Sequence, residues 1–168
     1  MEERFSGSVL ASESQEAPIT RTLGEIGLNS FAPYLMNRIM ARYNTSLSEA
    51  LKPKQMTTVK MRTLSILTIT PSATINELSV FAVTEQSTMS RILDSLEEQG
   101  YIRREARRDD MRIRDVSITE AGREVFNSAW PIMYESMLQM FADISEDEHH
   151  AFVGTLQKML RNIRKHEI

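Results

Sequence analysis

Six arginines between Tyr101 and Arg114 form the most distinctive group of chemically active side chains in the sequence. They stand at positions 103, 104, 107, 108, 112 and 114 and are accompanied by three acids, Glu105, Asp109 and Asp110, which leaves a local net charge of +3. A guanidinium binds phosphate oxygens by charge and by paired hydrogen bonds. The segment therefore indicates a surface for a polyanion, although a solvated ribbon that only protects a strand edge has the same composition.

The segment before it, Thr84 to Gln99, has the pattern of a helix with two different faces. Apolar residues recur at the spacing of one face, at Met89, Ile92, Leu93 and Leu96. The opposite face of the first two turns carries polar residues: Glu85, Gln86, Ser87, Thr88, Ser90 and Arg91. Such groups bond phosphates or base edges, and arginine can grip guanine at O6 and N7. This face predicts a DNA contact; an ordinary solvated helix surface is the alternative.

Two helices and a hairpin are expected to position these side chains. Thr74 and Glu77 form a T-x-x-E capping box that opens a short helix from Ile75 to Phe81. Thr84 is the expected N-cap of the next helix, and Gly100 can close it in the left-handed conformation. Residues 101–118 then alternate with period two around a polar loop at 107–110, which predicts a two-stranded hairpin with a basic tip. This order is that of a winged helix-turn-helix, whose second helix enters the major groove.

Longer helices are expected on both sides of this unit. One can start with Ser30 as N-cap and should stop before Pro53, and another covers residues 57–70. Thr119 caps a long helix that Pro131 should kink without ending, with a seam at Phe126, Trp130, Met133, Met137, Met140 and Ile144. Ser145 and Glu148 make a second capping box before a helix striped by Phe152, Leu156, Leu160 and Ile163.

These stripes hold more apolar surface than one small chain can bury, which favours association into a homodimer. Packing of both stripes within the monomer is the alternative. The sequence thus predicts a mainly α-helical protein with a small β-hairpin, a winged helix-turn-helix flanked by N- and C-terminal dimerisation helices. The expected regions are an acidic tail at 1–29, a dimerisation helix at 30–53, the DNA-binding domain at 54–118 and dimerisation helices at 119–168.

Composition excludes several classes of function. The chain of 168 residues has no cysteine, so disulfides, thiolate metal sites and thiol-based sensing are excluded. Neither a long apolar run nor a signal peptide is found, so we expect a cytoplasmic protein without membrane contact. The net charge of -3 resides in Met1 to Glu16, which has four glutamates and one arginine. Catalytic motifs are missing, and no enzyme activity or cofactor is expected.

Two stretches of the sequence resemble the MarR-type (multiple antibiotic resistance) regulators. The first is TEQSTMSRILDSLEEQGYIRR, from Thr84 to Arg104, which is similar to the family's recognition helix and first wing strand. The second combines the D-x-R signature of Asp110–Arg112 with VSITEAG, from Val116 to Gly122. The similarity follows the element order from about Ser30 to Ile163, and its specific matches lie within residues 74–122. The sequence departs from the family at Arg107 and Arg108, where such wings often carry an acidic residue and a proline.

The resemblance implies a homodimer that binds a pseudo-palindromic operator, commonly as a repressor released by a small, often phenolic, ligand. By position, Ser87, Thr88, Ser90 and Arg91 would lie in the major groove, while Arg112 would belong to the minor-groove wing and Asp110 would position it. The complete set of candidate DNA contacts is Thr84, Gln86, Ser87, Thr88, Ser90, Arg91, Arg107, Arg108, Asp110 and Arg112. A helical dimer that binds another protein is the alternative function.

An effector is expected in the crevice between the dimerisation helices and the winged domain. The candidate lining residues are Tyr34, Arg38, Met61, Trp130 and Tyr134. The same residues could equally be ordinary core, and Arg38 could pair with Glu25 or Glu49 instead of a ligand carboxylate. His149 and His150 are not expected to bind metal, because adjacent helix residues point about 100° apart.

Overall fold

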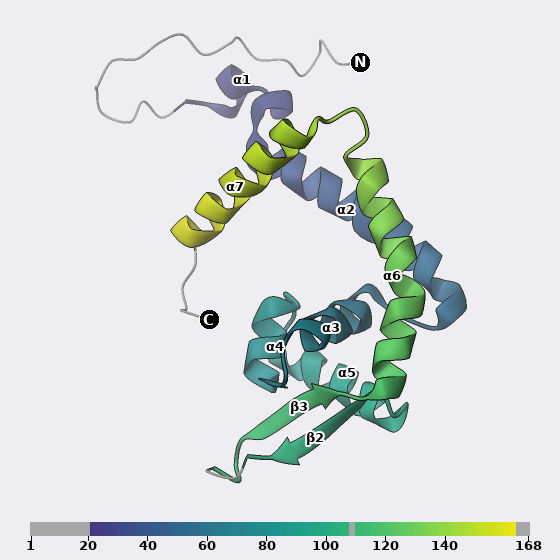
Figure 1. Cartoon of the computed structure of the whole chain (residues 1–168). Helices are drawn as coiled ribbons and strands as arrows, with labels where there is room; N and C mark the ends of the chain where they lie inside the picture. Colours follow the sequence, from purple (N-terminus) through teal and green to yellow (C-terminus); the bar gives the residue numbers. More distant parts are fainter. Residues whose placement is uncertain (1–20, 108–109, 164–168) are drawn as a thin grey trace. The chain divides into compact units, whose positions relative to one another are not determined.

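The computed structural model describes residues 21–107 and 110–163, which form helices and one small antiparallel sheet (Figure 1). The predicted mainly α-helical protein with a β element after the second helix of a helix-turn-helix is confirmed. The chain divides into two compact units within helix α2 (Ala32–Leu51), the first ending at Ser46 and the second beginning at Leu47. Helix α2 therefore contributes residues to both units.

The first unit starts with a helical turn, α1 (Leu23–Ile26), in the region that the sequence assigned to the tail. Thr22 and Glu25 form a capping box: the Glu25 carboxylate accepts the Thr22 backbone N–H at 2.7 Å. A 3-10 helix, η2 (Leu28–Ser30), follows, and α2 begins at Ala32. The prediction that Ser30 is the N-cap of α2 is therefore wrong, because Ser30 belongs to the preceding 3-10 turn.

The second unit begins with the end of α2 and the core helix α3 (Thr58–Ile69). The helix α2 ends before Pro53, as predicted, and a 3-10 helix, η3 (Lys52–Lys54), connects the two. The Thr57 hydroxyl caps α3 by accepting the backbone N–H of Lys60 at 3.2 Å. Three large apolar side chains of α3, Met61, Leu64 and Leu67, are fully buried.

The helix-turn-helix consists of α4 (Ile75–Phe81) and α5 (Gln86–Glu98). The Thr74–Glu77 capping box is confirmed: the Glu77 carboxylate accepts both the backbone N–H and the hydroxyl of Thr74 at 2.7 Å. The N-cap of α5 is Glu85, so the prediction of Thr84 is wrong. The backbone N–H of Thr84 instead donates to the Ser79 carbonyl at 3.0 Å and closes the turn between the helices.

That turn contains a strained residue. Val83 has a φ of 54°, in the left-handed region that β-branched residues rarely adopt, and its side chain is 79% exposed. The Arg62 guanidinium donates to the carbonyl of the neighbouring Ala82 at 2.9 Å. This bond from α3 holds the turn in the conformation that Val83 must follow.

Val83→Gly is therefore expected to raise the free energy of unfolding by about 1 kcal/mol, because glycine adopts the left-handed region without a Cβ clash. The exposed valine side chain loses little burial. Thermal unfolding measures the effect at one fixed protein concentration. Val80→Gly, in the body of α4, is the matched control and should lower stability by about 1 kcal/mol. A Val83→Gly variant less stable than the parent would contradict the strain.

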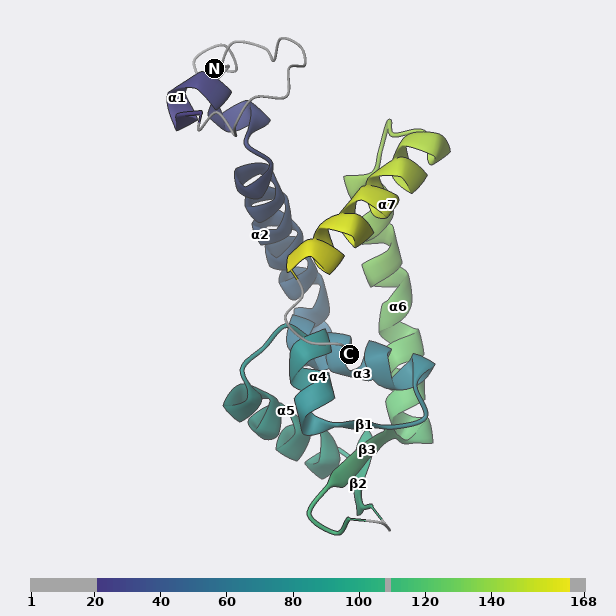
Figure 2. The ribbon, with the colours of Figure 1, turned by 90° about the vertical axis from the view of Figure 1, so that its left-hand side faces the viewer.

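The sheet has three strands, β1 (Ala73–Thr74), β2 (Ile102–Ala106) and β3 (Arg114–Ile118), in the antiparallel order β1-β3-β2. The predicted alternation is confirmed, since Ile102, Val116 and Ile118 are buried. The predicted two-stranded hairpin is confirmed as β2 and β3. The sequence missed the third strand, because β1 pairs with β3 through only two residues, too few for a periodic signal. Figure 2 shows the sheet at one end of the second unit, near α4, α5 and the start of α6.

The last two helices are α6 (Glu120–Met140) and α7 (Glu146–Ile163). The Thr119 and Ser145 caps are confirmed, and α6 continues past Pro131 as predicted. The described residues of α7 include no buried side chain; Phe152, Leu160 and Ile163 are 44%, 61% and 74% exposed. In residues 21–107 and 110–163, no helix is both long enough and apolar enough to cross a bilayer.

Candidate nucleic-acid interface

The outer face of α5 is polar and open. Gln86, Ser87, Thr88 and Arg91 are exposed, and Thr84 and Ser90 are half-buried. The opposite face is closed, since Met89, Leu93 and Leu96 are at most 1% exposed in the core. The predicted division of the helix into an apolar and a polar face is confirmed, while the contacts of the polar face with DNA stay a prediction.

Contacts from α3 and β2 fix the position of α5. The Lys60 ammonium donates to the Ser95 hydroxyl at 2.9 Å and to the Gln99 side-chain carbonyl at 3.1 Å. These bonds hold the C-terminal half of α5 against α3. The N-terminal half, which carries the polar face, therefore projects from a fixed base.

Arg104 joins α5 to the wing, by which we mean residues 102–118. Its guanidinium forms an ion pair with Asp94 at 2.8 Å and a second, tight one with Glu97. The hydrogen bond from Arg104 is the largest cause of the lowered pKa of Glu97. The bridge therefore ties α5 to β2 of the wing.

The sequence analysis did not find this bridge. It counted Arg104 only among the arginines of the basic hairpin. The alternation of the strand contains the missing signal, because Arg104 pairs in register with the buried Val116 and so faces α5. A charged arginine on the inner face of the hairpin needs an acidic partner, and α5, the helix that precedes β2, carries acidic residues.

A tight turn presents Arg112 at the tip of the wing. The backbone N–H of Ile113 donates to the Asp110 carbonyl at 2.9 Å, and the Asp110 carboxylate accepts the backbone N–H of Arg112 at 3.0 Å. The Arg112 side chain is 94% exposed and lies 3.6 Å from the same carboxylate. Asp110 thus shapes the turn and orients the arginine, as the D-x-R resemblance implied. Arg108 lies outside the described residues.

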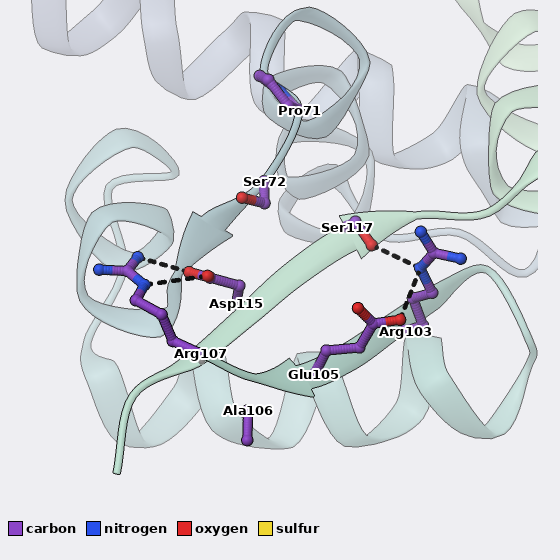
Figure 3. Close-up of a pocket in the computed structure, with 8 residues that line it drawn as sticks. All are labelled: Pro71, Ser72, Arg103, Glu105, Ala106, Arg107, Asp115 and Ser117. Carbon is purple, nitrogen blue, oxygen red and sulfur yellow. Dashed lines mark hydrogen bonds and ion pairs between the residues drawn. The ribbon is translucent and has the colours of Figure 1, made fainter. Parts of the chain in front are cut away.

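Arg107 has a different environment. Its Nε and Nη2 donate to the two carboxylate oxygens of Asp115, at 3.0 and 2.6 Å. Figure 3 shows this pair on the outer face of the sheet, where a shallow hollow is also lined by Arg103, Glu105 and Ser117. The hydrogen bonds from Arg107 lower the pKa of Asp115. Of the candidate DNA contacts that the structure describes, Arg107 has the most strongly bound guanidinium.

The candidate effector residues fall in both units. In the first unit, the Arg38 guanidinium donates to the Tyr34 hydroxyl at 3.3 Å and lies 5.8 Å from the Tyr34 ring centroid. In the second unit, Trp130 and Tyr134 are 45% and 46% exposed on α6, with ring centroids 6.0 Å apart. Met61 is fully buried in the core. The role of these residues as ligand contacts stays a prediction.

The histidines of α7 have aromatic neighbours. The ring of His149 packs edge-on against Phe141, with centroids 4.5 Å apart. Across the part of the chain that the structure describes, no three His, Cys, Asp or Glu side chains are grouped as a metal site would need.

Comparison with known proteins identifies the arrangement of these elements. A model of the MarR family matches residues 56–113, which include the helix-turn-helix and most of the wing. The structure of a MarR-family transcriptional regulator from Silicibacter pomeroyi is 48% identical and has a TM-score of 0.83; the match covers 88% of this chain and 100% of that one. The chain belongs to the MarR family.

Other MarR-type proteins are more distant. The HTH-type transcriptional repressor IacR of Pseudomonas putida is 24% identical over 139 residues, which cover 83% of each chain. CouR from Rhodococcus jostii RHA1, solved with p-coumaroyl-CoA, is 19% identical with a TM-score of 0.72, and the match covers 79% of this chain and 94% of that one. The likeness to CouR shows the shared fold. The winged helix fold predicted from the sequence is confirmed.

Proposed function

We propose that this MarR-family regulator is a sequence-specific DNA-binding repressor that acts as a homodimer on a pseudo-palindromic operator. The observation that carries the proposal is the exposed polar face of α5 beside a hairpin whose turn presents Arg112, with Arg104 tying the two together. A recognition helix reads base edges in the major groove, and an arginine suits the narrow minor groove. One module therefore contacts two successive grooves.

The proposed contacts follow from this geometry. Arg91, exposed on α5, is proposed to read a guanine, and Asp110 to orient Arg112 in the minor groove. Arg108, outside the described residues, remains a proposed DNA contact. The major-groove set is Thr84, Gln86, Ser87, Thr88, Ser90 and Arg91.

The apolar side chains that α6 and α7 leave exposed support a homodimer. Leu138, Ile144, Phe152, Leu160 and Ile163 are each between 44% and 74% exposed. Exposing such a stripe to water is unfavourable, at roughly 25 cal/mol for each Å² of apolar surface. We propose residues 30–53 and 119–168 as the dimerisation helices. Two-fold symmetry would then place the two recognition helices about 34 Å apart, one turn of the duplex.

An aromatic acid or phenol is the proposed effector. CouR was solved with p-coumaroyl-CoA, and the DNA binding of BpsR from Bordetella bronchiseptica is regulated by 6-hydroxynicotinic acid, so the fold accommodates aromatic ligands in other proteins. The proposed contacts are Tyr34 and Arg38 on α2 and Trp130 and Tyr134 on α6. Met61, fully buried, is the candidate with the least support.

Selection of bound fragments from the host genome, followed by gel shifts, tests the proposal. We expect the protein to prefer an inverted-repeat fragment over random duplex at moderate ionic strength. A plot of the logarithm of the binding constant against the logarithm of the salt concentration should have a slope of about -0.9 for each phosphate contacted. A protein-interaction module predicts no preference and no salt dependence, and a strictly monomeric protein would contradict the dimer.

The effector is tested on the same complex. Adding 6-hydroxynicotinate or p-coumarate should release the fragment, because a ligand that prefers one dimer arrangement shifts the population toward it. Thermal shifts on the free protein and on the complex measure this preference. Compounds that stabilise both equally would count against ligand control.

A further inference from the structure

Arg107 differs from Arg112 in how much of its charge is available. One edge of the Arg107 guanidinium, Nε and Nη2, donates to both oxygens of the Asp115 carboxylate, and the two side chains are only 37% and 26% exposed. Arg112 is 94% exposed, and the Asp110 carboxylate lies 3.6 Å away. A guanidinium paired in bidentate fashion with a carboxylate forms a nearly neutral unit, so it attracts a phosphate less than an open arginine. Arg107 is therefore poorly suited to bind DNA directly.

Asp115 occupies the place in the sheet where all three strands meet. It pairs in register with Glu105 of β2 on one side and with Thr74 of β1 on the other. Thr74 is also the N-cap of α4, the first helix of the helix-turn-helix. A side chain bound to Asp115 is thus attached to the point where the wing joins the DNA-binding helices.

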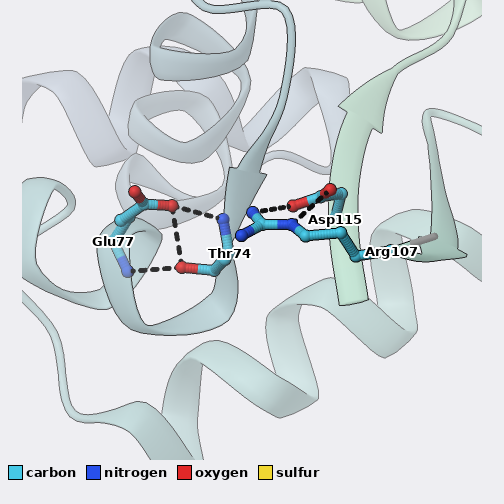
Figure 4. Close-up of polar contacts among 4 residues, drawn as sticks. All are labelled: Thr74, Glu77, Arg107 and Asp115. Atoms are coloured by element: carbon cyan, nitrogen blue, oxygen red, sulfur yellow. Dashed lines mark hydrogen bonds and ion pairs between the residues drawn. The ribbon is translucent and has the colours of Figure 1, made fainter. Parts of the chain in front are cut away.

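Figure 4 shows the guanidinium of Arg107 pointing from Asp115 toward the Thr74–Glu77 capping box. The charge of Arg107 also affects the pKa of Glu77. Hydrogen bonds from Thr74 are the main cause of its lowered pKa, and the positive charge of Arg107 lowers it further. The guanidinium therefore interacts with the start of α4 as well as with β3.

The backbone of Arg107 lies at the base of the wing turn. Its N–H donates to the Ile113 carbonyl at 2.9 Å, beyond the last paired residues of β2 and β3, Ala106 and Arg114. The loop that follows carries Asp110 and Arg112. A side-chain bridge at this base restricts the conformations of the loop. A binding loop that is already ordered loses less conformational entropy when it binds, so it binds more tightly.

We propose that Arg107 is a positioning residue, which braces the wing against Asp115 so that Arg112 is held ready for the minor groove. The proposal rests on the proposed DNA-binding function and replaces the expectation that Arg107 itself contacts DNA. Substitution of Asp115 distinguishes this role from a simple electrostatic one. Removing an acid from a DNA-binding surface should strengthen binding by simple electrostatics, whereas loss of a brace weakens it.

Fluorescence anisotropy with the selected inverted-repeat fragment, at several salt concentrations, tests the brace. Asp115→Asn and Arg107→Gln should each weaken binding about fivefold, the effect of one ion pair, without changing the salt slope. The double variant should be no weaker than either single one. The swapped variant, Arg107→Asp with Asp115→Arg, should recover most of the affinity.

Arg103→Gln is the matched control, because Arg103 lies on the same face of the hairpin but pairs with Glu105 and Ser117. It should bind within twofold of the parent, since an exposed ion pair contributes little. The brace is overturned if Asp115→Asn binds as tightly as the parent or tighter. It is also overturned if Arg107→Gln reduces the salt slope by about 0.9, the signature of one lost phosphate contact.

Hydrogen exchange in the free protein separates this inference from the proposed function, because it needs no DNA. In Asp115→Asn, the amides of Arg107 and Ile113 should exchange faster, while those of the α5 core stay protected. Faster exchange supports the brace even if the parent binds no fragment, a result that would reject only the DNA-binding function. Unchanged exchange overturns the brace.

Discussion

Gly122→Ala is expected to lower the free energy of unfolding by about 3 kcal/mol, the largest stability effect that we predict. A Cβ at this position would lie 2.1 Å from the carbonyl oxygen of Tyr101 and 2.8 Å from Cγ1 of Ile118. The first of these obstacles is backbone and cannot rotate away. Either the first turn of α6 or the start of the wing must therefore move.

The movement would break a connected set of hydrogen bonds. The Tyr101 carbonyl accepts the backbone N–H of Thr119 at 3.0 Å, and the Thr119 hydroxyl donates to the Gly100 carbonyl at 2.7 Å. The same hydroxyl caps α6 by accepting the Gly122 N–H at 3.1 Å. This junction fixes where α6 leaves the wing, so we also expect weaker DNA binding.

Chemical denaturation at one fixed protein concentration measures the effect, because dimer stability depends on concentration. Gly24→Ala, in α1 and outside the proposed dimerisation helices, is the matched control: an added Cβ would meet only the Thr22 hydroxyl, at 3.9 Å, so stability should stay level or rise by about 1 kcal/mol. Equal free energies of unfolding for Gly122→Ala and the parent would contradict the prediction that a Cβ at this position cannot be accommodated.

Arg91→Ala is expected to weaken operator binding by about 1 to 3 kcal/mol and to relax the base preference at one position. Arg91 is exposed on the polar face of α5. Truncating it therefore removes a contact without opening the core. Anisotropy against a set of single-base operator variants measures both affinity and preference.

Two further variants make this result specific. Arg112→Ala should lower affinity with a smaller change in preference at the major-groove positions, because the minor groove distinguishes bases poorly. Arg103→Ala removes an exposed arginine of the outer sheet face and should leave the preference unchanged. Arg91→Ala that binds every operator variant like the parent would remove the α5 face from the proposed interface.

Local signals account for the parts of the fold that the sequence predicted. The capping boxes at Thr74 and Ser145 connect residues three apart, and the stripe of Met89, Leu93 and Leu96 repeats within a single helix. Such interactions depend on neighbours along the chain and hold in almost any context. They defined α4, most of α5 and α7, and hence which residues form the polar face of the candidate site.

The errors came from contacts that the local pattern of residue types does not show. Thr84 has the ideal side chain for an N-cap, but its N–H closes the turn onto Ser79, which moves the start of α5 onward. The two residues of β1 carry no periodic pattern and become a strand only because β3 lies beside them.

Sequence alone determined the order of the main helices and the hairpin, the polar face of α5 and the resemblance to the MarR family, because periodicity, caps and motifs are written in nearby residues. Tertiary structure alone decided what each wing arginine does. Arg104 turns inward to α5, Arg107 to Asp115, and Arg112 outward at the turn, although all three have the same side chain. The reason is that a guanidinium binds whichever carboxylate folding brings within reach, and that distance is a property of the folded chain.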